Sequence, residues 1–221
     1  MAIFDEELKA LKEKVLKLGS MVEAAIRDSV NSLVERNSDL ASGVIEKDHQ
    51  INALEVGIDE ECVRLIALRQ PMARDLRFLT IAMKITTDLE QMGDLAVNIA
   101  ERAIELNEEP LLKPYKNIPK MAEITQKMVR DSLDAFVRGC STLPYEVIKR
   151  DDEVDDLTVK NFNELVALMI QDPKIVTVAV KRTYVAKYLE RIADHATNIA
   201  EMVIYMYKGK IIRHVESPEE A

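Results

Sequence analysis

The chain has 221 residues, with many charged and aliphatic side chains and few glycine, proline or aromatic residues, a composition typical of long helices. Its net charge of -9 argues against electrostatic binding to nucleic acid, which requires basic surfaces. No apolar run approaches the roughly 20 residues that span a bilayer, and the N-terminus is amphipathic rather than a signal peptide. Cys62 and Cys140 form no CxxC motif. We therefore expect a cytoplasmic protein with reduced cysteines and no membrane insertion.

Apolar residues recur at spacings of three and four along most of the chain, which predicts helices. Breaks occur near residue 37 and near Pro71, Pro144 and Pro173. The predicted helices cover about 4–36, 38–70, 72–107, 118–139, 142–172 and 173–208.

Residues 107–119 contain three prolines and cannot be helical throughout. The pattern thus predicts an all-α protein made of two similar three-helix bundles. The expected division is a first bundle at 1–109, a linker at 110–117, a second bundle at 118–210 and an acidic, frayed tail at 211–221.

The two predicted bundles match each other element by element. MVEAAIRDSV, which starts at residue 21, matches MVRDSLDAFV at 128, and KDHQINAL at 47 matches RDDEVDDL at 150. The clearest match is DLEQMGDLAVNIAE at 88 with YLERIADHATNIAE at 188. An internal duplication of a three-helix unit explains all three matches.

The repeated Glu-x-x-x-Asp-x-x-x-Asn stretch places its polar side chains on one narrow stripe, because helical residues are about 100° apart. The preceding helix runs antiparallel after a tight turn, so residues equally far from that turn lie level with each other. Asp94 is then level with Asp48, and Glu90 with Asn52. In the second half Glu190 is level with Asp155 and Asp156, and Asp194 with Asp151 and Asp152. The candidate metal ligands are Asp48, Asn52, Glu90, Asp94, Asn98, Glu101, Asp151, Asp155, Glu190, Asp194, Asn198 and Glu201.

Carboxylates crowded in this way repel each other unless they bind a cation or take up protons. Oxygen ligands favour magnesium, calcium, manganese or iron. The di-iron oxidase signature requires a histidine three residues after the glutamate, where this chain has Gly93 and Ala193. His49 and His195 follow stripe aspartates but point about 100° away from them. The chain also contains no phosphate-cradling loop or nucleophile motif, so we expect no enzymatic activity.

Three interpretations remain open at this point. The protein could be a binding adaptor whose cation sites tune a docking surface, or a metal-dependent enzyme or metal-storage bundle. It could also be a scaffold without metal, whose acidic stripes are simply solvated. The loop RQPMARDLR is likewise open to two explanations, helix capping by residues such as Arg69 and Asp75, or a basic tip that docks a partner.

Together, the tandem organisation, LALRQPMARDLRFLTIAMKITTDLEQMGDLAVNIAE and YLERIADHATNIAE resemble the PhoU family of bacterial phosphate-signalling proteins over essentially the whole chain. The resemblance implies a cytoplasmic negative regulator of phosphate-starvation signalling and of phosphate uptake. It further implies an adaptor between the ATPase subunit of a phosphate ABC transporter and a sensor histidine kinase. Wide apolar arcs on long helices add the expectation of a homodimer.

The same resemblance implies that the repeated motif holds multinuclear metal clusters of iron or zinc, with manganese or magnesium as other candidates. Carried over residue by residue, the motif falls on Glu90 and Asp94 with Asp48 in the first half. In the second half it falls on Glu190, Asp194, Asp151 and Asp155. Asn52 stands where the family pattern leads us to expect an acid, so we expect the first site to bind cations less tightly.

Overall fold

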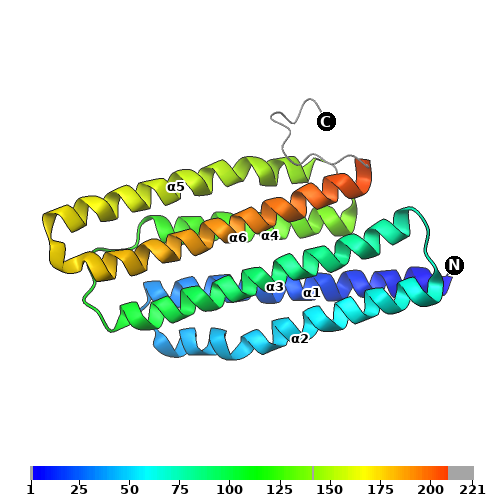
Figure 1. Cartoon of the computed structure of the whole chain (residues 1–221), viewed down its shortest axis with the longest axis horizontal. Coiled ribbons are helices and arrows are strands. Elements are labelled where there is room, and N and C mark those ends of the chain that lie inside the picture. Colours follow the sequence, from blue (N-terminus) through cyan, green and yellow to red (C-terminus); the bar gives the residue numbers. More distant parts are fainter. Residues whose placement is uncertain (1, 141, 209–221) are drawn as a thin grey trace.

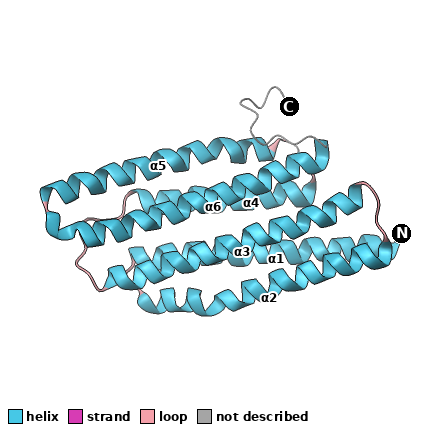
Figure 2. Ribbon diagram, in the orientation of Figure 1, coloured by secondary structure: helices cyan, strands magenta, loops and turns pink. Residues whose placement is uncertain are grey.

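The computed structural model describes residues 2–140 and 142–208, and within them the chain is helical without any strand (Figure 2). The α-helices are α1 (Ala2–Val34), α2 (Ser38–Arg69), α3 (Arg74–Asn107), α4 (Asn117–Arg138), α5 (Leu143–Gln171) and α6 (Val176–Lys208). A 3-10 helix, η1 (Pro173–Ile175), precedes α6. The all-α prediction of two tandem three-helix units is confirmed. The predicted tail at 211–221 lies outside the described residues.

The six helices form two antiparallel three-helix units that lie side by side (Figure 1). Helix α3 packs against α1, α2 and α6, and α6 packs against α3, α4 and α5. Helices α1 and α4 also contact each other, whereas α2 and α5 lie at the outer edges. The two helices that carry the repeated motif, α3 and α6, are therefore the central pair of the molecule.

The helices form because their apolar residues recur on one face that the neighbouring helices cover. Helix α1, for example, buries Leu11, Val15, Leu18, Val22, Ile26, Val30 and Leu33, which are spaced three and four apart. Helix α3 buries most of its circumference because three other helices surround it. One continuous core runs through both halves, so the two units share their interior.

The turns follow the predicted breaks with two small differences. After α2, both Gln70 and Ala73 have positive φ angles of 46° and 47°, so α3 begins at Arg74, two residues later than predicted. After α5, the Asp172 side chain accepts a hydrogen bond from the Lys174 amide at 3.1 Å. This cap directs Pro173 into a 3-10 turn, and the α-helical part of α6 starts at Val176.

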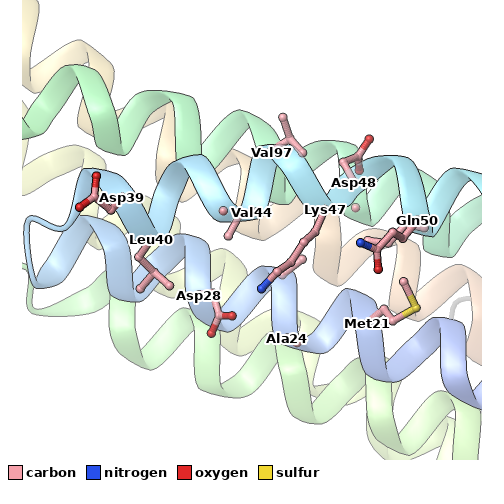
Figure 3. A pocket seen from close by; sticks show the side chains of 14 residues that line it. Met21, Ala24, Asp28, Asp39, Leu40, Val44, Lys47, Asp48, Gln50 and Val97 are labelled. Carbon is pink, nitrogen blue, oxygen red and sulfur yellow. The ribbon is translucent and has the colours of Figure 1, made fainter.

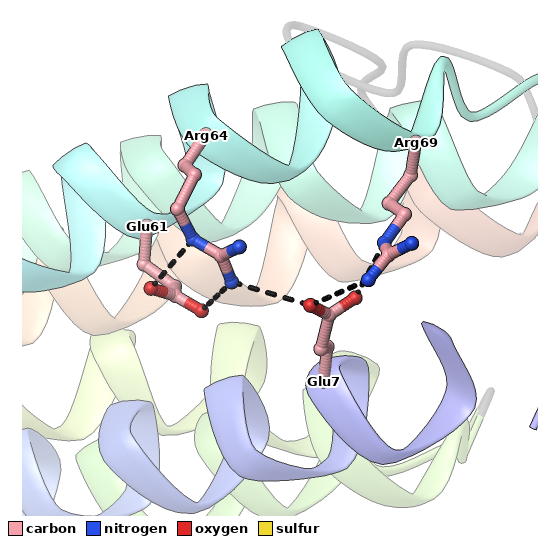
Figure 4. Close-up of polar contacts among 4 residues, drawn as sticks. All are labelled: Glu7, Glu61, Arg64 and Arg69. Carbon is pink, nitrogen blue, oxygen red and sulfur yellow. Dashed lines mark hydrogen bonds and ion pairs between the residues drawn. The ribbon is translucent and has the colours of Figure 1, made fainter. Parts of the chain in front are cut away.

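The basic tip between α2 and α3 is partly explained by ion pairs with α1 (Figure 4). Arg69 Nε donates to Glu7 Oε2 at 2.8 Å, and Arg64 bonds both Glu61 and Glu7. The hydrogen bond from Arg69 is the largest cause that holds the pKa of Glu7 below its ordinary value. Arg69 therefore ties the end of α2 to α1, which is a structural role other than the predicted capping of α2.

Candidate functional site

The second half brings four of the predicted carboxylates into one electrostatic cluster between α5 and α6. Burial raises the pKa of Asp151 to about 7, with further contributions from Asp194 and Asp155. Burial is also the largest cause that raises the pKa values of Asp155 and Asp194, and repulsion from Glu190 comes next for both. We call Asp151, Asp155, Glu190 and Asp194 the second cluster.

The first half forms the corresponding first cluster, made of Asp48, Asn52, Glu90 and Asp94, between α2 and α3. Burial and the Asp94 charge raise the pKa of Asp48, whereas a 2.9 Å hydrogen bond donated by Asn52 Nδ2 to Asp48 Oδ2 opposes the increase. Burial and then Asp94 raise the pKa of Glu90. The antiparallel register thus places the residues of α2 and α3 level with each other, as the turn position indicates.

The two clusters differ in how their negative charge is offset. In the second cluster Lys187 Nζ donates to Glu190 Oε1 at 2.6 Å, whereas the matching position in the first half is Thr87. In the first cluster, the neutral Asn52 takes the place of an acid. Lys187 lies three residues before Glu190, a spacing that favours such a pair on any helix, so the sequence could have indicated it.

Several oxygen atoms of the clusters face no hydrogen-bond donor. Asp48 Oδ1, Asn52 Oδ1 and Glu190 Oε2 are buried without a partner within the described residues. An added Cβ at Gly93 would lie 3.2 Å from Ile51 Cδ1 and 3.5 Å from Asp48 Oδ1, so the glycine allows α2 and α3 to pack closely beside this carboxylate. Unpartnered acceptors and raised carboxylate pKa values are the features that a bound cation would relieve.

The side chains do not, however, converge on one point. Across residues 2–140 and 142–208, no group of three or more His, Cys, Asp or Glu side chains is positioned to hold a metal ion. The donor chemistry of the clusters fits a hard cation, and the cation role of these residues stays a prediction.

The four remaining candidates lie farther along the central helices. Asn98 and Asn198 come one helical turn after the stripe aspartates and are half-buried. Glu101 and Glu201 lie seven residues after those aspartates, which is about 10 Å along the helix axis. They could therefore bind only a second cation, beside one held by the aspartates. Their place as ligands is likewise a prediction.

The two histidines next to the stripe bond elsewhere. His195 Nδ1 lies 2.8 Å from Asp88 Oδ1 and so connects α6 with α3 across the two halves. His49 Nδ1 lies 2.6 Å from the Glu46 carbonyl oxygen of its own helix. His195 therefore contributes to the packing of the central pair, a role that sequence analysis missed because the partner lies 107 residues away.

A groove of about 360 Å³ adjoins the first cluster between α1, α2 and α3 (Figure 3). Its lining is mainly apolar, and Lys47 extends across it from α2 toward α1. Asp48 is the member of the first cluster that lines the groove, together with Asp28 and Asp39 from the neighbouring helix ends. Glu90 and Asp94 are not in its wall, and the groove contains no serine, cysteine or histidine.

None of the described helices combines the length and the apolar character that crossing a membrane requires. The fold and the paired clusters together define a class of protein: tandem three-helix bundles that repeat a carboxylate stripe on the two central helices.

Comparison with known proteins assigns the family. The PhoU domain model matches residues 15–103 and 118–203, one match in each half. The "Phosphate-specific transport system accessory protein PhoU homolog" of Aquifex aeolicus is 45% identical over 215 residues, which cover 97% of each chain. The "Phosphate-specific transport system accessory protein PhoU" of Escherichia coli is 35% identical and aligns over 98% of this chain and 90% of its own.

Solved structures agree with this assignment. The crystal structure of PhoU from Pseudomonas aeruginosa superimposes with a TM-score of 0.90 at 41% identity, covering 94% of this chain and all of the other. A "phosphate transport system regulatory protein PhoU" from Streptococcus pneumoniae has a TM-score of 0.86 at 30% identity and covers 94% of this chain and 98% of its own. The chain belongs to the PhoU family.

Proposed function

We propose that this protein is an accessory, regulatory protein of phosphate transport that acts in the cytoplasm. The observation that carries the proposal is the family match in both halves, with relatives named as accessory or regulatory proteins of phosphate transport that align along nearly their full length. The protein would act as a negative regulator, restraining phosphate-starvation signalling and phosphate uptake when phosphate is plentiful.

The mechanism we propose is that of an adaptor rather than an enzyme. One surface contacts the ATPase subunit of a phosphate ABC transporter, and another contacts a sensor histidine kinase, so that transporter state reaches the kinase. The shared core supports this mechanism, because the α3 and α6 pair gives the two halves a continuous packed connection through which a change at one surface would reach the other.

The two carboxylate clusters are proposed cation sites of this adaptor. Iron or zinc in a multinuclear cluster, or manganese or magnesium, would neutralise the carboxylates. Asp48, Glu90 and Asp94 would hold it in the first half; Asp151, Asp155, Glu190 and Asp194 would do so in the second. Neutralisation would remove the repulsion that raises the carboxylate pKa values and would change the charge of the docking surface.

A metal-dependent enzyme or a metal-storage bundle is the second candidate, and the groove beside Asp48 is the observation that favours it. Catalysis there would need a nucleophile or proton-transfer group beyond the aspartates. The lining supplies Lys47 but no serine, cysteine or histidine for that task. The adaptor function therefore accounts better for the site.

The adaptor proposal is tested by measuring binding of the purified protein to two immobilised partners, the transporter ATPase subunit and the cytoplasmic region of the sensor kinase. We expect saturable binding to each. Because the clusters are acidic, we expect affinity to depend on added divalent cation and on salt. Absence of binding to both partners, with and without cation, would exclude the adaptor mechanism.

A further inference from the structure

A cavity of about 310 Å³ lies where the linker between the two halves meets α5 and α6. Its walls include the cationic residues Lys113, Lys116 and Arg182, against one carboxylate, Glu164. The cavity is therefore lined by net positive charge in a chain whose net charge is -9. None of its lining residues belongs to either carboxylate cluster.

Two polar side chains in this cavity are almost completely buried. Asn161 is 4% exposed and Arg182 is 6% exposed. Asn161 Nδ2 and Arg182 Nε have no hydrogen-bond partner anywhere in the described parts of the chain. Both atoms are hydrogen-bond donors, and a buried donor without an acceptor destabilises the folded state. The cavity thus offers unpaired donors that an acceptor-rich ligand would satisfy.

The close contacts of Arg182 are made with the linker and not with a carboxylate. Its Nη1 donates to the Lys113 carbonyl oxygen at 3.2 Å, and its guanidinium lies 4.3 Å from the centroid of the Tyr115 ring. These contacts anchor the linker and fix the orientation of the guanidinium. Within residues 2–140 and 142–208, no carboxylate lies within ion-pair distance of Arg182. Burial lowers the pKa of Arg182, and the more distant charge of Glu164 only partly opposes this effect.

The repeat shows that the fold does not require these polar residues. Asn161 of α5 corresponds to Ile58 of α2, and Arg182 of α6 corresponds to Ala82 of α3. Ile58 and Ala82 are both fully buried. The first half therefore packs the same positions with apolar side chains, which avoids the cost of burying an unpaired charge. The second half therefore buries two polar side chains at positions where the first half has an apolar interior.

We propose that this cavity binds a small oxyanion. Arg182 Nε and Asn161 Nδ2 would donate hydrogen bonds to its oxygens, and the two lysines would add positive charge. Because Glu164 also lines the cavity, the preferred anion is one that keeps a proton to donate to this carboxylate, and inorganic phosphate is the test case. This inference goes beyond the proposed adaptor function and does not depend on it.

The test is equilibrium dialysis of the full chain with radiolabelled inorganic phosphate in the presence of a chelator. Chelation matters because the carboxylate clusters could hold phosphate only through bridging cations. We expect saturable binding of one phosphate per chain. Unlabelled phosphate should compete more strongly than sulfate, which has no proton to donate near neutral pH, and more strongly than acetate. Equal competition by sulfate would overturn the role of Glu164, and lack of saturable binding would overturn the site.

Two variants separate the cavity from the rest of the protein. Asn161→Ile introduces the residue that the first half carries, and we expect it to weaken phosphate binding at least tenfold while the helical circular dichroism is kept. Lys116→Glu changes an exposed side chain, keeps the core intact and should weaken binding as well. The control, Lys9→Glu, makes the same charge change at an exposed position of α1 outside the cavity lining and should bind phosphate as the parent does. Parent-like affinity in Lys116→Glu or Asn161→Ile would contradict the proposal.

Discussion

At the scale of single residues, the duplication lets each side chain of one cluster be compared with its counterpart. Asn52 and Thr87 in the first half stand where the second half has Asp155 and Lys187. The first cluster is thus less acidic and contains a hydrogen bond between Asn52 and Asp48 that offsets its repulsion. The second cluster has more carboxylates, one of them paired with lysine.

The cation role of these residues gives the first prediction. Asp94→Ala with Asp194→Ala removes one carboxylate from each cluster, so we expect bound metal to fall to background. Elemental mass spectrometry after equal exposure to iron, manganese, zinc and magnesium measures the metal content. Because both aspartates are exposed at the surface, the variant should stay folded. Negligible metal in both the parent and the variant would mean that the acidic stripes are solvated helix faces and not cation sites.

A second prediction follows from the raised pKa of Asp151, about 7. In the folded protein the Asp151 carboxyl loses its proton near pH 7. In the unfolded chain the same carboxyl loses its proton near pH 4. Between these values the folded state binds more protons, so in metal-free protein this residue lowers the free energy of unfolding as pH rises from about 4 to 7. The loss is complete above pH 7.

Asp151→Asn should therefore raise the free energy of unfolding at pH 8 by about 1–2 kcal/mol, after allowance for solvent screening, and have little effect at pH 4.5. Urea unfolding with a chelator present at both pH values checks this. Asp156→Asn, an exposed change on the same helix, is the control and should show no such pH dependence. A variant less stable than the parent at pH 8 would mean that the Asp151 charge is favourably solvated.

At the scale of helices, close contact between the halves depends on Gly19 in α1. An added Cβ at Gly19 would lie 2.1 Å from Leu133 Cδ1 of α4, and Leu133 is itself buried, so it cannot move without displacing its neighbours. Gly57 in the middle of α2 has no atom within 4 Å of such a Cβ. An alanine at Gly57 therefore tests helix propensity alone, whereas an alanine at Gly19 tests helix propensity together with packing.

We expect Gly57→Ala to raise the free energy of unfolding by about 0.5–1 kcal/mol, because alanine favours the helix. Gly19→Ala gains the same propensity but should be about 1 kcal/mol less stable than the parent, because overpacking costs about 1–3 kcal/mol. Thermal and urea unfolding of both variants measure the difference. A stabilised Gly19→Ala would show that Leu133 repacks at low cost.

Helix positions were predictable because they depend on local signals. Periodic apolar residues and the prolines at 71, 110, 114 and 173 located the helices to within a few residues. Helix α3 starts two residues after the predicted position because Gln70 and Ala73 adopt positive φ angles, which nothing in their side chains indicates. Long-range contacts were missed for the same kind of reason: His195 with Asp88, and Arg182 with the linker, join positions far apart in sequence.

At the scale of the whole molecule, the duplication and the family were predictable, whereas the joining of the two halves was not. Two repeats in sequence do not determine whether their interiors merge. In the structure Lys181 of α6 pairs with Glu105 of α3 at 3.1 Å, and one core continues across both units. The two carboxylate clusters are therefore parts of one packed body.

The function that we propose for the protein is to restrain phosphate-starvation signalling. The most direct measurement is the activity of a phosphate-starvation promoter in bacteria that lack their own PhoU-family protein, with and without this chain, in phosphate-rich medium. We expect the chain to lower promoter activity severalfold in phosphate-rich cells and to leave the promoter fully induced in starved cells. Unchanged promoter activity, with the protein folded and present at normal levels, would contradict it.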